Sequence, residues 1–178
     1  MMGRAMTRLI ALFTAAVIVL AGCDTTTGGS GSTRQYKISS NSTAKIQYRV
    51  LDSINALRQA SGAPALELNA QLNAAAATHS RDMSIQNRPW HFGSDGSSPL
   101  QRVQRVGYTG RFLGENISET YETDMQTIEA WLADEGTRTI LLNPEARHLG
   151  FAWYQESNGK IWWTLVTGSP VDTPQVHG

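Results

Sequence analysis

The sequence has very little cysteine and no excess charge of either sign. Cys23 is the single cysteine among 178 residues, so no intrachain disulfide can form and the Cys/His clusters of structural zinc modules cannot be built. The 15 Lys and Arg balance the 15 Asp and Glu, which leaves no basic field to attract a nucleic-acid backbone. Apolar residues make up 40% of the chain, enough for a packed core, while charged residues make up 17%. We therefore expect a folded protein with no nucleic-acid partner.

The first 22 residues have the pattern of an export signal. Arg4 and Arg8 precede a run of 12 apolar or small residues at 9–20, shorter than the about 20 residues of a membrane span. The sequence Leu20-Ala21-Gly22-Cys23 resembles the lipobox of bacterial lipoproteins, where cleavage before the cysteine leaves its thiol carrying a diacylglycerol. We expect residues 1–22 to be removed and Cys23 to anchor the protein in a membrane. The alternative is an ordinary signal peptide with Cys23 beside its cleavage site by chance.

Polar sequence separates Cys23 from the rest of the chain. Residues 24–33 contain no apolar side chain to bury and three glycines, which raise the entropic cost of ordering them. We expect residues 23–42 to be the lipidated cysteine and a flexible tether, residues 43–169 to form one domain, and residues 170–178 to be a loose tail. The signal carries two Arg and no acid, so the mature side chains have a net charge of 13 − 15 = −2.

Three segments show the 3.6-residue period of an amphipathic helix. The first begins at Ser42 or Thr43 and ends before Gly62, the second follows Asn69, and the third runs from Thr123 or Asp124 to about Glu135. The expected buried faces are Ile46, Val50, Leu51, Ile54 and Leu57; Leu72, Ala76, His79 and Met83; and Met125, Ile128, Trp131 and Leu132.

Two later segments alternate with a period of two, which predicts strands. Leu149, Phe151 and Trp153 occupy one face of the first segment, and Ile161, Trp163 and Leu165 occupy one face of the second. Between the two segments, Asn158-Gly159 suits the positive φ angles of a tight hairpin turn. Because both faces of this strand pair are apolar, each face requires a covering layer. The sequence therefore predicts an α+β fold with helices over an antiparallel sheet.

His91 and Glu115 are the candidates for chemistry. His91 lies between two aromatic residues in Trp90-His91-Phe92, and Glu115 lies in Gly114-Glu115-Asn116-Ile117. A His and a Glu brought together bind a divalent cation or polarise a water molecule. A single His near a turn also has an ordinary interpretation as a hydrogen-bonded structural group. The sequence has no His-Glu-x-x-His, no Gly-x-Ser-x-Gly and no phosphate-binding glycine loop, so these known catalytic patterns are excluded.

The order of several motifs resembles the CAP superfamily, the group of cysteine-rich secretory proteins, antigen 5 and plant pathogenesis-related proteins, in its short bacterial form. The resemblance covers residues 44–166. The motifs that carry it include His79-Ser80-Arg81-Asp82-Met83, His91-Phe92-Gly93-Ser94-Asp95-Gly96, Gly114-Glu115-Asn116-Ile117 and Trp131. This resemblance implies a three-layer α-β-α sandwich, which agrees with the helices and the doubly apolar hairpin.

The resemblance also implies a central cleft, which family members line with two His and two acidic residues. It assigns the four cleft positions to His91, Glu115, Gln126 and Thr137, with Trp90 as a neighbouring wall. One carboxylate and one imidazole make a poor zinc site, because zinc generally takes at least three protein ligands. We expect no cofactor, and we interpret His79 as a hydrogen-bonded packing residue.

Two function classes remain. The favoured one is a lipid-anchored, non-enzymatic binding or scaffolding module with a degenerate cleft, monomeric and facing the periplasm or the exterior of a bacterial cell. Its partners are the membrane, through Cys23, and an unknown ligand or protein of the envelope. The alternative is an envelope hydrolase that acts on a peptide or polymer, with Glu115 as base and His91 as acid or metal ligand.

Overall fold

A computed structural model describes residues 36–171. The expectations for the signal segment, for Cys23 and for residues 172–178 lie outside this range. Among the residues described, no helix is both long enough and apolar enough to cross a membrane.

Four strands form a single mixed sheet in the order β1-β3-β4-β2. The long hairpin of β3 (His148–Gln155) and β4 (Ile161–Ser169) forms its centre, and Phe151 is opposite Leu165. On one side β2 (Arg111–Ser118) pairs antiparallel with β4. On the other, β1 (Glu67–Leu68) pairs in parallel with the start of β3. β2 is therefore an edge strand over its full length.

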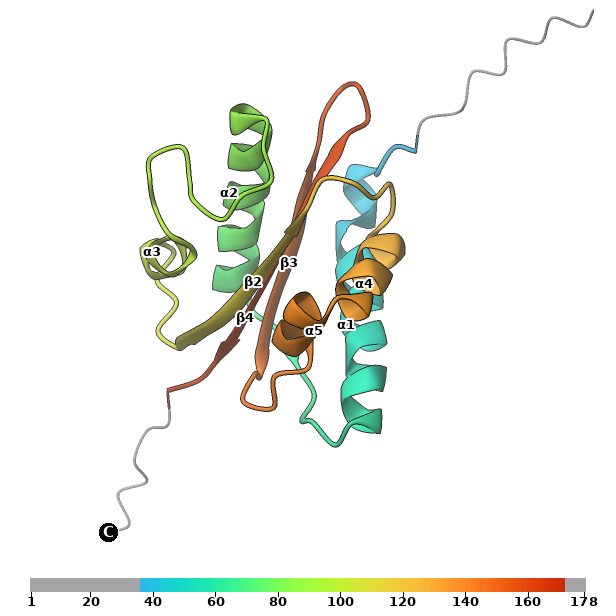
Figure 1. Cartoon of the computed structure of the whole chain (residues 1–178), viewed down its shortest axis with the longest axis vertical. Coiled ribbons are helices and arrows are strands. Elements are labelled where there is room, and N and C mark those ends of the chain that lie inside the picture. Colours follow the sequence, from blue (N-terminus) through green and yellow to red (C-terminus); the bar gives the residue numbers. More distant parts are fainter. Residues whose placement is uncertain (1–35, 172–178) are drawn as a thin grey trace, which may run out of the picture. The chain divides into compact units, whose positions relative to one another are not determined.

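Helices cover both faces of this sheet (Figure 1). One layer contains α1 (Thr43–Ala60), α4 (Asp124–Ala133) and α5 (Glu135–Leu141), and a short 3-10 turn, η1 (Ser40–Ser42), leads into α1. The other layer contains α2 (Ala70–Gln86) and α3 (Pro99–Arg105). The predicted α+β class and the three-layer sandwich are thus confirmed.

The predicted helices form, with two corrections. The Asn69 side chain caps α2 by accepting a hydrogen bond from the Leu72 amide, as expected from its position. Leu57, which we placed on the buried face of the first helix, is 41% exposed. The third helix ends at Ala133, because Asp134 turns the chain and caps a separate helix, α5. The periodicity did not predict α5, α3, β1 or β2.

The larger core lies between the sheet and the α1, α4 and α5 layer. Phe151 is at its centre, stacked on Trp163 at 5.7 Å and packed edge-on against Trp131 at 6.5 Å. Trp153 is half-buried and also contacts this core. Arg58 is fully buried beneath it and donates to the carbonyls of Pro64, Leu141, Asn143 and Ala146. These bonds tie the end of α1 to the segment between α5 and β3.

The hairpin turn differs in detail from the expectation. Gly159 has a positive φ of 93°, but Asn158 does not, because Asn87 is the only non-glycine residue with a positive φ among residues 36–171. The Gly159 amide donates to the Glu156 carbonyl at 2.9 Å, and the Glu156 amide donates to the Lys160 carbonyl at 2.8 Å. The loop is therefore a turn over residues 156–159 followed by a glycine bulge, rather than a turn with two positive φ angles.

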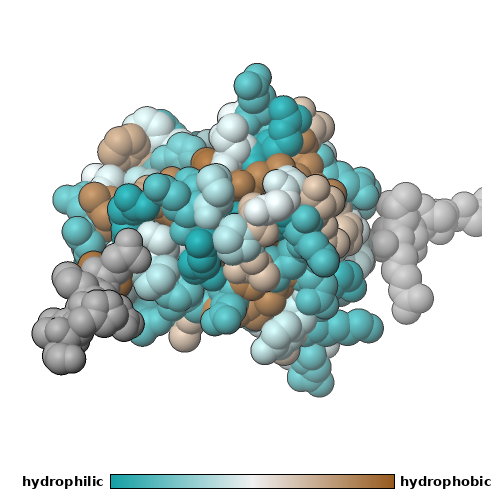
Figure 2. Space-filling model, turned by 90° about the horizontal axis from the view of Figure 1, so that it is seen from below, coloured by the Kyte–Doolittle hydropathy of each residue, from teal (hydrophilic) through white to brown (hydrophobic). Residues whose placement is uncertain are grey.

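Residues on the N-terminal side of Thr43 also contact the domain. The Ile38 amide donates to Oε1 of Gln155, whose Nε2 donates to the Tyr36 carbonyl. Ile38 packs against the larger core. The face seen in Figure 2 shows hydrophobic residues in small patches separated by hydrophilic ones, so this face has no continuous apolar surface.

Candidate functional site

The Glu-Asn pair of β2 divides its side chains between the two faces of the sheet, because successive strand residues point in opposite directions. Glu115 points towards the α2 and α3 layer, where its carboxylate meets Arg102 of α3. Asn116 points towards the other layer, and its Nδ2 donates to the Thr137 carbonyl of α5 at 3.0 Å. The amide therefore holds β2 to α5, while the carboxylate lies on the side of α3 and His91.

Arg102 holds the Glu115 carboxylate from one side. Its Nη2 lies 2.9 Å from Oε1 and 2.8 Å from Oε2 of Glu115, and its Nη1 donates to the Ser97 carbonyl. Both side chains are buried, with 5% and 2% exposed. Ser98 and Gln101 form a reciprocal cap at the start of α3, which places Arg102 one turn into the helix. A buried, hydrogen-bonded ion pair results, in which both carboxylate oxygens already accept a charged donor.

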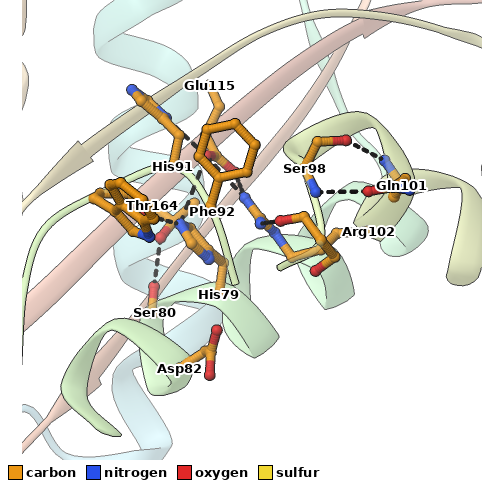
Figure 3. Close-up of polar contacts among 12 residues, drawn as sticks. His79, Ser80, Asp82, His91, Phe92, Ser98, Gln101, Arg102, Glu115 and Thr164 are labelled. Carbon is orange, nitrogen blue, oxygen red and sulfur yellow. Dashed lines mark hydrogen bonds and ion pairs between the residues drawn. The ribbon is translucent and has the colours of Figure 1, made fainter. Parts of the chain in front are cut away.

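His91 approaches the same carboxylate from the solvent side (Figure 3). Its Nδ1 lies 2.9 Å from Oε1 of Glu115, and the side chain is 51% exposed. Since a carboxylate only accepts hydrogen bonds, Nδ1 is the donor, and this fixes the orientation of the ring. Nε2 makes no hydrogen bond to any of the residues described. The imidazole therefore presents one free nitrogen to the exterior.

His79 of α2 lies beneath the cluster and is fully buried. Burial lowers the pKa of His79, and the charge of Arg102 acts in the same direction. The neutral ring donates from Nε2 to the Trp90 carbonyl at 3.0 Å, while Nδ1 has no hydrogen-bond partner in the described structure. Nε2 also lies 3.6 Å from Oε1 of Glu115, a dipolar contact because a neutral ring carries no charge. His79 thus fixes the segment that carries His91.

The other two cleft positions do not join this cluster. Gln126 is exposed and forms a reciprocal cap with Thr123 at the start of α4. The Thr137 hydroxyl donates to the Trp131 carbonyl at 2.7 Å, within the opposite helical layer. Over residues 36–171, no hydrogen bond joins either side chain to His91 or Glu115. The structure brings together His91 and Glu115, with Trp90 beside them, and adds Arg102 and His79.

The residues of this cluster do not fit a metal ion. A cation at Glu115 would meet the positive guanidinium of Arg102, which already bonds both carboxylate oxygens. Nδ1 of His91 is used in its bond to the same carboxylate. The described part of the chain contains no group of three or more His, Cys, Asp or Glu side chains placed to hold a metal ion. Zinc chemistry therefore has no support from this donor set.

Sequence reasoning gave Arg102 no role and His79 only a packing role. The signal for Arg102 is its position four residues after Ser98, which with Pro99 marks the start of a helix. Only the tertiary fold shows that this turn of α3 meets Glu115, 13 residues further along the chain.

The fold and the site define an α-β-α sandwich domain with a His/Glu cluster beside the edge strand. Residues 51–167, or 117 of the 178, match the model of the CAP family, described as the cysteine-rich secretory protein family. The chain therefore belongs to the CAP family.

Two relatives come from Bacillus subtilis (strain 168). The protein YkwD is 30% identical over 122 residues, which cover 68% of this chain and 47% of that protein. The membrane protein YlbC is 30% identical over 118 residues, which cover 64% of this chain and 34% of that protein. The chain thus spans less than half the length of these curated relatives.

Solved structures show the same fold. An outer surface protein from Borrelia burgdorferi has a TM-score of 0.66 at 16% identity, covering 76% of this chain and 98% of that one. An extracellular protein containing an SCP domain from Bacillus anthracis str. Ames has a TM-score of 0.62 at 24% identity, covering 74% of this chain and 44% of that one.

Proposed function

We propose that this protein is a lipid-anchored binding module of the bacterial cell envelope, and that its His/Glu cluster positions a binding surface instead of catalysing a reaction. The observation that carries the proposal is the contact of Nη2 of Arg102 with both carboxylate oxygens of Glu115. A general base must reach the proton that it removes, and each oxygen of this buried carboxylate already accepts from a guanidinium. Glu115 instead orients His91 through Nδ1, so that Nε2 faces a ligand.

The hydrolase alternative requires Glu115 to act as base or metal ligand with His91 as its partner. Arg102 opposes both roles, because it occupies the carboxylate oxygens and repels a cation. Glu115→Gln tests the alternative, since Gln keeps an acceptor for Arg102 and removes the basic carboxylate. Wild type and variant are incubated with labelled casein and with purified cell-wall polymer, and both should release equal, background amounts of product. Product from wild type that disappears in a folded Glu115→Gln variant would overturn the proposal.

The location in the envelope has two supports. The sequence Leu20-Ala21-Gly22-Cys23 has the residues of a lipobox, and the relatives include an outer surface protein, an extracellular protein and a membrane protein. We expect Cys23→Ser to move the protein from the detergent-rich phase to the aqueous or unprocessed fraction. The matched control is Ser32→Ala in the same polar stretch, which should remain in the detergent-rich phase. A Cys23→Ser protein that has lost residues 1–22 and still remains in the detergent-rich phase would contradict lipid anchoring.

A further inference from the structure

We propose that Arg88, Trp90, His91 and Phe92 form a binding site for an acidic saccharide, which we call the aromatic ladder. This inference rests on the proposed function, because it names the ligand class of the surface that His91 faces. The ladder follows the end of α2, where Asn87 adopts a left-handed conformation with φ 50° and turns the chain back along the helix.

Three hydrogen bonds to α2 hold the backbone of the ladder in place. The Arg88 amide donates to the Met83 carbonyl at 3.2 Å, and His79 donates to the Trp90 carbonyl at 3.0 Å. Gln86 donates from Nε2 to the Phe92 carbonyl at 3.1 Å. Alternate residues of the segment are therefore fixed before a ligand arrives, which lowers the entropic cost of binding.

The side chains form a cluster that remains open to solvent. The Arg88 guanidinium carbon lies 3.5 Å from the centroid of the Trp90 ring, and the Phe92 ring centroid lies 5.3 Å from that of Trp90 at an angle of 55°. Trp90 is 39% exposed and Phe92 is 46% exposed. Two adjacent aromatic residues held at this exposure, beside a charged group, mark a recognition surface.

Arg88 supplies a charge that has no counterpart in the fold. Its guanidinium makes no hydrogen bond or ion pair with any residue in the range 36–171, although Arg102 and Arg105 on α3 each pair with a carboxylate. Stacking on Trp90 orients the guanidinium and leaves its donors free for a planar anion. His91, which lies between Trp90 and Phe92 in the sequence, adds a second exposed polar side chain.

These groups match the surface of a sugar ring that carries an acid group. A pyranose has an apolar C–H face that packs on an aromatic ring, and hydroxyl groups at its polar edge that donate hydrogen bonds to Nε2 of His91. A carboxylate on that sugar pairs with Arg88. A nucleic-acid base would also stack on the ladder, but the chain has no basic field for a phosphate backbone.

The experiment is a saturation-transfer NMR titration of the full-length chain in detergent with three disaccharides. N-acetylglucosaminyl-N-acetylmuramic acid carries a carboxylate of the wall-glycan type, a hexuronate disaccharide carries one of the capsular type, and chitobiose is the neutral control. We expect at least one acidic probe to bind about tenfold more tightly than chitobiose, as expected for one charge-assisted contact. The preferred acidic probe identifies the source of the ligand.

Single substitutions test separately the aromatic and the charged parts of the aromatic ladder. Trp90→Ala should abolish binding of every probe, and Arg88→Gln should remove the preference for acid. The matched control is Arg81→Gln, because Arg81 lies 5.8 Å from the Tyr154 ring in a second cation-π pair outside the ladder. Equal binding of neutral and acidic probes, no binding of any probe, or an unaltered preference in Arg88→Gln would overturn the inference. Binding to anionic vesicles without binding of a saccharide would also overturn it, in favour of a lipid surface.

Mass spectrometry of the recovered disaccharide separates this inference from the proposed function. A probe that binds and is recovered intact supports both. A probe that binds and is cleaved contradicts the binding-module proposal while retaining recognition of acidic saccharides. A probe that is intact and unbound contradicts the ladder alone.

Discussion

The two faces of the sheet are built from different kinds of residues. The face towards α1, α4 and α5 buries large side chains around Phe151, including three tryptophans that contact it. The face towards α2 and α3 has a smaller core cluster, in which alanines and valines predominate: Leu72, Ala75, Ala76, Val103, Tyr108, Ala152 and Val166. Trp162 of β4 and Met83 of α2 are the large side chains buried on this face. The first face therefore supplies more apolar burial, and the second leaves room for a polar site.

The small residues bring α2 into direct contact with the sheet. A Cβ added at Gly150 would lie 2.2 Å from the Leu72 carbonyl carbon, so the α2 backbone packs on β3 with no side chain between them. Ser80 of α2 also donates to Thr164 of β4 at 2.8 Å. This close approach fixes the distance between His79 of α2 and the sheet. Because His79 bonds the Trp90 carbonyl, it also helps to position the neighbouring His91. Stability and site geometry are thus concentrated on opposite faces.

The largest expected effect tests the contrast between the two cores. Phe151→Ala removes the ring at the centre of the aromatic cluster and should lower the free energy of unfolding by about 3–5 kcal/mol. The matched variant Val166→Ala, on the α2 face of the adjacent strand, removes two carbons and should cost about 2 kcal/mol or less. Urea denaturation of both variants measures the difference. Equal losses would contradict the unequal division of burial between the faces.

A smaller effect concerns the pH dependence of the α2 face. Burial holds the pKa of His79 below its ordinary value of 6.5, so protons bind the unfolded chain more readily than the folded one. The stabilisation from neutral His79 is complete above pH 6.5 and declines as the pH falls from there towards the lowered pKa of the folded state. His79→Gln keeps a donor for the Trp90 carbonyl and removes this titration.

We therefore expect the free energy of unfolding of wild type to fall between pH 7 and pH 5, and that of His79→Gln to be flatter over the same range. The control is His91→Gln, which changes an exposed imidazole of the same cluster. Chemical denaturation at a series of pH values measures these slopes. Identical slopes for wild type and His79→Gln would show that another group dominates the titration.

Much of the fold was predictable because the spacing of apolar residues along the sequence indicates which face of a helix or strand is buried. α1, α2 and α4 and the β3-β4 hairpin have continuous apolar faces, and the structure contains all of them. α3 and α5 have seven residues each, too few for a periodic signal, and depend on capping by Ser98 and Asp134. β2 carries Gly-Glu-Asn at its centre, where burial is determined by Arg102 and α5 instead of by hydrophobicity.

Only those residues of the candidate site that belong to a recognisable sequence motif could be predicted. The family resemblance singled out His91 and Glu115, which the structure places 2.9 Å apart. Arg102 could not be predicted as their partner. Its ion pair with Glu115 forms only because the tertiary fold packs α3 against β2, and no local sequence pattern reports that packing. The aromatic ladder depends on the left-handed turn at Asn87, and no periodic pattern reports that turn.

The smallest expected effect concerns the hairpin that both faces share. Gly159 has φ 93°, a conformation that β-branched residues rarely adopt, so Gly159→Val should lower the free energy of unfolding by about 1–2 kcal/mol. Asn158→Ala is the control: Asn158 has no positive φ, and its side chain makes two exposed hydrogen bonds, one accepted from the Lys160 amide and one donated to Glu156. This control should cost about 0.5 kcal/mol or less, as for most surface changes. Thermal melting of both variants distinguishes the observed turn from one with two positive φ angles, in which Asn158→Ala would also place a non-glycine residue at positive φ and cost about 1 kcal/mol.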